Sequence, residues 1–214
     1  MENATQFIFQ ILIILFSVII HEVSHGYAAL MLGDKTAQYA ERLTLNPVKH
    51  IDPFGSILLP VMLALMHAPI IGWAKPVPFN PYNLRNQKWG PAIVGAAGPL
   101  ANMALALIFG FVVRGFANLP LETATPFFIN FVTIASIISI LNLFLALFNL
   151  IPIPPLDGSK VLFALLPYHW RSAQWFLERY GIFVILIFIV FLSPVLRNTA
   201  FFLFRLISGT LPFI

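Results

Sequence analysis

The stretch SVIIHEVSHGYAAL, residues 17–30, places two histidines and a glutamate inside an almost unbroken apolar run. On a helix, residues four positions apart face the same way, so His21 and His25 share one face. Ionisable side chains at membrane depth are expensive unless they are paired, and they usually mark function. The stretch therefore predicts a membrane-embedded helix that carries a polar site.

The composition is typical of a membrane protein. Of the 214 residues, 59% are hydrophobic and 9% are charged, whereas a soluble domain usually carries about 25% charged residues. The chain has no cysteine, so any metal must be held by histidine and carboxylate. Its basic residues form no cluster with interleaved aromatics, so we expect a lipid bilayer and no nucleic acid as its partner.

The apolar segments predict an all-α polytopic membrane protein with a single domain covering residues 1–214. A helix that crosses a bilayer needs about 20 apolar residues, and about five to six hydrophobic helical segments come near this length. The candidates lie at 7–32, 54–69, 91–113, 127–151 and 181–196, followed by an apolar tail at 197–214 that contains Gly and Pro.

The segment 54–69 has only 16 residues. If it crosses the membrane, the 12 Lys and Arg residues divide six to six between the two sides. If it re-enters, the loops 33–53, 70–90 and 152–180 share a side, and the division becomes nine to three. The positive-inside rule favours a re-entrant or short segment, with the nine-charge side in the cytoplasm.

The motif HEVSH, residues 21–25, has the spacing of a zinc-binding helix. Two imidazoles one helical turn apart can bind one Zn²⁺ through their ring nitrogens. Glu22 follows the first ligand and is placed to take a proton from a water at the metal. The alternative is a pair of helix-packing histidines with a glutamate partner, but the cost of such groups in hydrocarbon favours a metal.

A catalytic zinc usually takes three protein ligands and keeps one position for water. The candidate for the third ligand is Asp157, in NLIPIPPLDGSK, residues 149–160, where prolines end a helix and free the backbone. Membrane proteins tolerate free backbone only inside a protein-lined cavity. An ordinary interfacial turn is the alternative. With a re-entrant 54–69, Asp157 and the histidine end of the first segment lie on the same side, so charge bias and metal geometry favour one topology.

Together these motifs resemble those of the site-2 protease family of intramembrane zinc metalloproteases, in its short bacterial branch without PDZ or CBS domains. HEVSH resembles the zinc helix of the family, and NLIPIPPLDG resembles its third-ligand motif N-x-x-P-x-P-x-L-D-G. AAGPLAN, residues 96–102, resembles the central G-P-x-x-N motif, and the stretches 43–60 and 72–81 are typical of the short branch. Ser159 departs from the second Gly of many relatives.

The resemblance implies a zinc metalloendopeptidase that cleaves transmembrane protein substrates in or beside their membrane segments, in regulated intramembrane proteolysis. It implies one Zn²⁺ per chain, held by His21, His25 and Asp157, with Glu22 as the general base. It also implies a multi-pass protein of the bacterial inner membrane with its active site toward the cytoplasm. Asn149 and Asn102 are candidates for contacts with the substrate or the developing oxyanion, and local helix-end or packing roles are the alternatives.

Two further expectations concern the substrate and the competing functions. Weak alternation over residues 39–45 predicts a short membrane-associated β-strand, whose edge could pair with an extended substrate. A membrane metal-ion transporter that uses the His/Asp cluster is the alternative function, and a scaffold that keeps the metal only for folding is a third. A transporter would normally carry more polar residues across its helices than this chain has.

Overall fold

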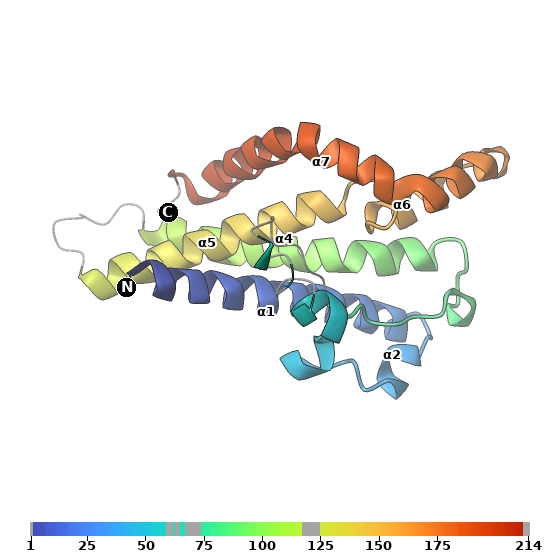
Figure 1. Cartoon of the computed structure of the whole chain (residues 1–214), viewed down its shortest axis with the longest axis horizontal. Helices are drawn as coiled ribbons and strands as arrows, with labels where there is room; N and C mark the ends of the chain where they lie inside the picture. The colour runs from blue at the N-terminus through green and yellow to red at the C-terminus, as the bar shows by residue number, and fades with distance from the viewer. Residues whose placement is uncertain (1, 59–61, 63–64, 67–73, 117–124, 212–214) are drawn as a thin grey trace. The chain divides into compact units, whose positions relative to one another are not determined.

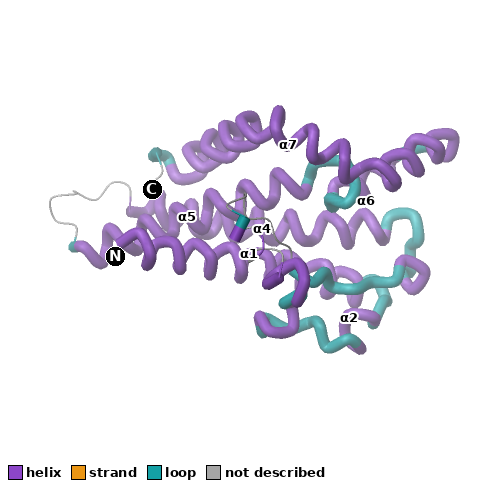
Figure 2. Tube along the Cα trace, in the orientation of Figure 1, coloured by secondary structure: helices purple, strands orange, loops and turns teal. Residues whose placement is uncertain are grey.

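A computed structural model describes residues 2–58, 62, 65–66, 74–116 and 125–211. Every regular element in these ranges is helical, and Figure 2 shows no strand among them. Three helical stretches are long and apolar enough to cross a membrane, and a bent helix adds a fourth if it counts as one span. The prediction of an all-α integral membrane protein is confirmed. The stretches are Phe9–Met31 in α1 (Glu2–Met31), α4 (Gly90–Phe116), α5 (Pro126–Asn149) and the bent α7 (Arg171–Ser208).

The predicted number of five to six segments is too high for the part of the chain that is described. The segment 181–196 and residues 197–208 of the apolar tail are not separate helices, because both belong to α7. Within 54–69, the π-helix η2 (Pro53–Leu58) is the first part. Most of the remainder lies outside the described residues, so its re-entrant course stays a prediction.

The strand predicted at 39–45 is wrong. The short helix α2 (Thr36–Tyr39) ends there, and the chain turns and bends through residues 40–45. Glu41 has a φ of 54°, in the left-handed region that no strand contains. The next residue, Arg42, is buried. Exposure does not alternate from one residue to the next across 39–45, as it would in a half-buried strand. The proposed edge for substrate pairing is therefore absent at these residues.

The backbone divides into two compact units, residues 1–90 and 91–214, and each is described by itself. In the first unit, α1 ends at Met31 because the chain reverses at Gly33, whose φ of 108° suits glycine. The N–H groups of Gly33 and Asp34 donate to the Leu30 and Ala29 carbonyls at 3.0 and 2.9 Å. The prediction of one domain for the whole chain stays a prediction.

The first unit also contains an irregular stretch, residues 74–85, which we call the return segment because its contacts follow the C-terminal half of α1. Its only regular element is the 3₁₀ turn η3 (Pro81–Asn83). Backbone amides outside regular structure need other partners, and here α1 and its exit supply them. The pairs are Val77 N to Glu22 Oε2 at 2.8 Å, Asn80 N to Asp34 Oδ2 at 2.6 Å, and Arg85 N to the Leu32 carbonyl at 2.9 Å.

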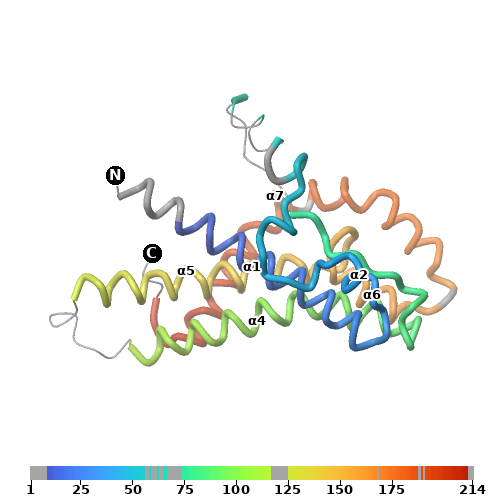
Figure 3. The backbone as a smooth tube through the Cα atoms, turned by 90° about the horizontal axis from the view of Figure 1, so that it is seen from below, coloured from blue at the N-terminus to red at the C-terminus, as the bar shows by residue number. Residues whose placement is uncertain are grey.

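In the second unit, α4 and α5 lie side by side in both views (Figure 1 and Figure 3). Small residues let these helices approach closely, as is usual in membranes. A Cβ on Gly110 of α4 would lie 2.6 Å from Ile207 Cγ2 of α7 and 3.1 Å from Ser139 Oγ of α5. The buried apolar core of the unit consists of Ala106, Val113, Val132, Ala135, Leu143, Ala200 and Phe204.

The long helix α7 is bent, as Figure 1 shows. Its parts Arg171–Ile187 and Phe191–Ser208 are inclined at 76°. Pro194 explains the bend, because a proline removes one helical hydrogen bond and clashes with the carbonyl four residues earlier. Before the bend, Arg179 Cζ lies 5.2 Å from the ring centroid of the exposed Trp175. An exposed tryptophan beside a basic residue is typical of a membrane interface.

Candidate metal centre and active site

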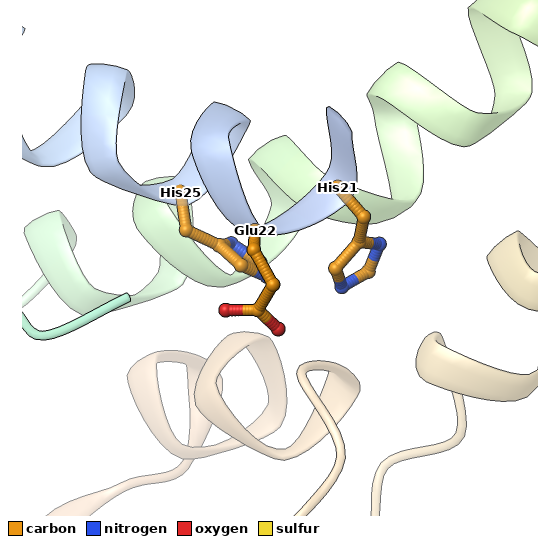
Figure 4. Close-up of side chains that lie close together, drawn as sticks. All are labelled: His21, Glu22 and His25. Atoms are coloured by element: carbon orange, nitrogen blue, oxygen red, sulfur yellow. The ribbon is translucent and has the colours of Figure 1, made fainter. Parts of the chain in front are cut away.

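His21, Glu22 and His25 project from α1 on one side (Figure 4). The two imidazole rings lie edge to face, with centroids 4.6 Å apart and an interplanar angle of 89°. One ligand atom from each of the three side chains lies within 4.8 Å of the other two. Two ligands on a tetrahedral zinc are about 3.4 Å apart, given bonds of about 2.05 Å. Small side-chain rotations would therefore bring both imidazoles onto one ion, and the donors fit zinc.

The cluster lies deep in a membrane span. With a rise of about 1.5 Å per residue, His21 is about 18 Å along the helix from Phe9 and about 15 Å from Met31, the two ends of the span. Each histidine is only 6% exposed. Ionisable side chains buried at this depth usually mark function, so the position itself favours a metal site over a packing role.

The return segment holds the carboxylate of Glu22. Val77 donates its backbone N–H to Glu22 Oε2 at 2.8 Å. Its neighbours Pro76 and Pro78 have no N–H, so Val77 supplies the sole backbone donor of this triplet. Gly26 on α1 allows the close approach, because a Cβ there would lie 2.9 Å from Val77 Cγ1 and 2.5 Å from Leu43 Cδ2.

Sequence reasoning found Glu22 but missed both Val77 and the buried Arg42. Arg42 is 7% exposed and donates from Nη2 to the Lys75 carbonyl at 2.7 Å. Burial lowers the pKa of Arg42, and the negative charge of Glu22 opposes this shift. The sequence signals that could have revealed these two residues were weak. Arg42 is a single arginine in a half-apolar loop, and Val77 is a single amide between two prolines.

Asp157 ends the irregular turn 150–157 and immediately precedes α6 (Gly158–Leu165). Its side chain is buried, and Oδ1 accepts a hydrogen bond from Lys160 Nζ at 2.8 Å. The turn is tight at Gly158, where a Cβ would lie 2.2 Å from the Leu150 carbonyl oxygen. Asp157 and the two histidines lie in different units, so their shared coordination of a metal stays a prediction.

The other two aspartates have structural partners. Asp34 is fully buried and accepts bonds from the Thr36 and Asn80 amides and from the Thr36 and Asn83 side chains. Burial alone would raise the pKa of Asp34, but these hydrogen bonds outweigh it and lower the pKa below 3.8. Asp52 Oδ1 accepts from the Phe54 and Gly55 amides at 3.0 and 2.7 Å. Both carboxylates therefore organise loops.

Both candidate asparagines have partners on helices. Asn102 is fully buried, and its Nδ2 donates to Asn142 Oδ1 at 2.7 Å between α4 and α5. Asn149 Nδ2 donates to the Leu145 carbonyl one turn earlier at 3.0 Å. These contacts are the packing and helix-end roles that were the alternatives. Contact of either asparagine with a substrate or an oxyanion stays a prediction.

Comparison with known proteins decides the family. A family model described as peptidase family M50 matches residues 117–192. A Bacillus subtilis protein named "Putative zinc metalloprotease YwhC" is 37% identical over 184 residues, covering 86% of this chain and 80% of that protein. The chain belongs to peptidase family M50, the site-2 protease family.

Two further relatives share lower identity with the chain. "Putative zinc metalloprotease Rip2" of Mycolicibacterium smegmatis is 29% identical over 189 residues, covering 87% of this chain and 68% of that protein. "Zinc metalloprotease MJ0392" of Methanocaldococcus jannaschii is 25% identical over 166 residues, covering 78% of this chain and 37% of that protein. No solved structure is significantly similar to the chain.

The family and the helices together make this M50 protein a membrane zinc metalloprotease. Zinc is its cofactor, and the His21–Glu22–His25 cluster has donors of the right kind. The resemblance drawn from the motifs is thus confirmed. Membership of a protease family also removes the reason for the transporter and scaffold alternatives.

Proposed function

We propose that this M50 protease hydrolyses peptide bonds within or beside the transmembrane segments of other membrane proteins, as a step of regulated intramembrane proteolysis. The observation that carries the proposal is the depth of the metal cluster, whose histidines lie about 9 Å (His25) and about 15 Å (His21) along the helix from the nearer end of the Phe9–Met31 span. A catalytic group at that depth reaches peptide bonds that are themselves in the membrane.

We assign the roles of the residues as follows. His21, His25 and Asp157 hold one zinc ion, a set of three ligands that leaves one coordination position open. When bound, the zinc supplies a Lewis acid that polarises the scissile carbonyl. Glu22 accepts a proton from the attacking water and passes it to the leaving amine. The Val77 amide keeps one oxygen of Glu22 engaged and thereby orients the carboxylate.

The substrate must expose its backbone before this chemistry can occur. A transmembrane helix hides its peptide groups in its own hydrogen bonds, so a local stretch must unwind, and its freed groups need partners. Asn149, at the end of α5 and eight positions before Asp157, is our candidate for such a partner. Asn102 is the second candidate, although substrate binding would compete with its bond to Asn142.

The charge bias supports the cytoplasmic side of a bacterial inner membrane as the location of the active site. The loops 33–53 and 70–90 flank the histidine end of α1 and carry six of the 12 basic residues. The metal cluster lies nearer the Met31 end of the span than the Phe9 end, so water would reach it from the cytoplasmic side.

The proposal is tested with purified protein in proteoliposomes and one scissile sequence placed in two reporters. One reporter carries the sequence inside a single transmembrane segment, and the other carries it in a soluble loop. We expect cleavage of the membrane reporter alone. Cleavage of the soluble reporter at an equal rate would contradict the proposal.

The roles of the residues are tested in the same assay. Glu22→Gln should lower kcat by about 10²–10⁴-fold, the usual contribution of a general base, and should retain one zinc per chain by metal analysis. Glu41→Gln is the matched control, because Glu41 is an exposed surface glutamate. Asp157→Ala should lose zinc. Retention of zinc and activity by Asp157→Ala would remove that residue from the metal site.

A further inference from the structure

Arg42 occupies an unusual position for a basic residue, because its guanidinium is buried among backbone carbonyls. Nη1 donates to the Lys49 carbonyl, and Nη2 donates to the Lys75 carbonyl at 2.7 Å and more weakly to the Pro76 carbonyl at 3.5 Å. One side chain thus joins the loop around Lys49 to the start of the return segment. A guanidinium suits this task, because its planar fork presents several donors at fixed angles.

Two of the three carbonyls that Arg42 binds, those of Lys75 and Pro76, lie immediately before the Val77 amide that contacts Glu22. Prolines at positions 76 and 78 fix the backbone φ there and hold the residues before them in extended conformations. The Lys75 amide donates to the His50 carbonyl at 2.9 Å, which ties the same point from its other side. The stretch from Lys75 to Val77 is therefore stiff and anchored at its N-terminal end. Its position sets the position of the Val77 N–H.

We infer that Arg42 is a positioning residue for catalysis: through the Lys75 and Pro76 carbonyls it fixes the Val77 amide, which in turn orients the Glu22 carboxylate. The inference rests on the proposed role of Glu22 as the base. The chain of contacts runs from Arg42 to the backbone at 75–76, then to the Val77 N–H, and ends at Glu22 Oε2.

A purely structural role for Arg42 gives different expectations. If Arg42 only stabilised the fold, its loss would lower the melting temperature and the zinc content along with activity. If it positions Glu22, its loss should leave the zinc helix intact and lower the rate of the chemical step. Residues that orient a reacting group without contacting the substrate typically contribute about 10–100-fold to activity.

The experiment measures kcat, KM, zinc content and amide hydrogen exchange for Arg42→Gln and Arg42→Lys. For Arg42→Gln we expect kcat to fall about 10–100-fold, with KM nearly unchanged and one zinc per chain retained. Arg42→Lys should recover only part of the loss, because one ammonium group cannot reach both the Lys49 and the Lys75 carbonyls. Lys35→Gln is the control, since it removes an exposed positive charge from the same loop.

A second variant tests the amide directly. Replacing Val77 by its α-hydroxy acid exchanges the N–H for an ester oxygen and keeps the side chain. This variant should lower kcat as much as Arg42→Gln does, and the two changes together should be less than additive because they break one chain of contacts. A fully additive double variant, or an ester variant with the kcat of the wild type, would overturn the inference.

Hydrogen exchange keeps the inference separate from the proposed function. In the wild type, the Val77 amide should be protected by its bond to Glu22, and Arg42→Gln should accelerate its exchange at least about tenfold. Unchanged protection in Arg42→Gln overturns the inference, whether or not a reporter is cleaved. If the wild type cleaves no transmembrane reporter but the exchange result holds, the proposed function fails and the positioning of Glu22 stands.

Discussion

Residues 1–90 and residues 91–214 hold their polar groups in different ways. In the first unit, three charged side chains, those of Glu22, Asp34 and Arg42, bind backbone groups of an irregular segment. In the second unit, the helices satisfy their own backbone, and close steric fit at glycines such as Gly110 and Gly158 sets their contacts. Hydrogen bonds between charged side chains and the backbone therefore hold the surroundings of the proposed base, Glu22. Close steric fit at Gly158 holds the turn that carries Asp157.

The largest expected effect comes from steric overlap in the second unit, at Gly158. Gly158→Ala would put a Cβ 2.2 Å from the Leu150 carbonyl oxygen, so the turn before α6 must shift. We expect a loss of about 3 kcal/mol of unfolding free energy, at the upper end of the range for overpacking, together with a loss of zinc. Thermal unfolding in detergent and metal analysis measure both.

Gly115→Ala is the matched control, because a Cβ there has no atom within 4 Å. It should be neutral or stabilising by roughly 0.5–1 kcal/mol, as expected for alanine in a helix. Equal effects of the two substitutions would show that steric fit at Gly158 does not govern this unit.

The next largest effect is expected when the charge of the buried Asp34 carboxylate is removed from the first unit. Asp34→Asn removes a charge that accepts four hydrogen bonds, and we expect a loss of about 2 kcal/mol at neutral pH. Because the pKa of Asp34 is lowered in the folded protein, its contribution is complete above the unfolded pKa and disappears as the pH falls through the folded pKa. Melting temperatures of wild type and variant should therefore converge in acid, below pH 3.8. A difference that persists unchanged well below pH 3.8, after the carboxyl has been protonated, would contradict this account.

A smaller effect is expected for the Asn102–Asn142 pair. Asn102→Ala should destabilise the protein by about 1 kcal/mol, within the range for hydrogen bonds between membrane helices. Double substitution with Asn142→Ala should cost less than the sum of the single changes. A fall in kcat without a fall in the melting temperature would instead favour the substrate role for Asn102.

The smallest effect is expected for an exposed ion pair in the first unit. Lys49 Nζ lies 2.7 Å from Glu41 Oε2, and the two side chains are 44% and 77% exposed, respectively. The hydrogen bond and the charge of Lys49 lower the pKa of Glu41. Lys49→Gln should return this pKa toward its ordinary value and leave the melting temperature unchanged, because surface pairs contribute little. A clear destabilisation would show that exposed charges also hold this unit together.

The sequence was informative wherever one pattern had one physical meaning. HEVSH needs only helical spacing to bring His21 and His25 together, and long apolar runs predicted α1, α4 and α5. The prediction of a strand at 39–45 failed because Glu41 turns the chain. The contact between Glu22 and Val77 joins residues that are 55 positions apart, and no periodicity reports a contact of that kind.

The turn between α5 and α6 also constrains how the gene can change. Gly158 packs directly against the backbone of Leu150, so the chain between the end of α5 and Asp157 closes on itself and has a fixed length. One inserted codon within 150–157 would displace either Leu150 or Asp157. We therefore expect mutational libraries to tolerate substitutions along this stretch far better than insertions or deletions.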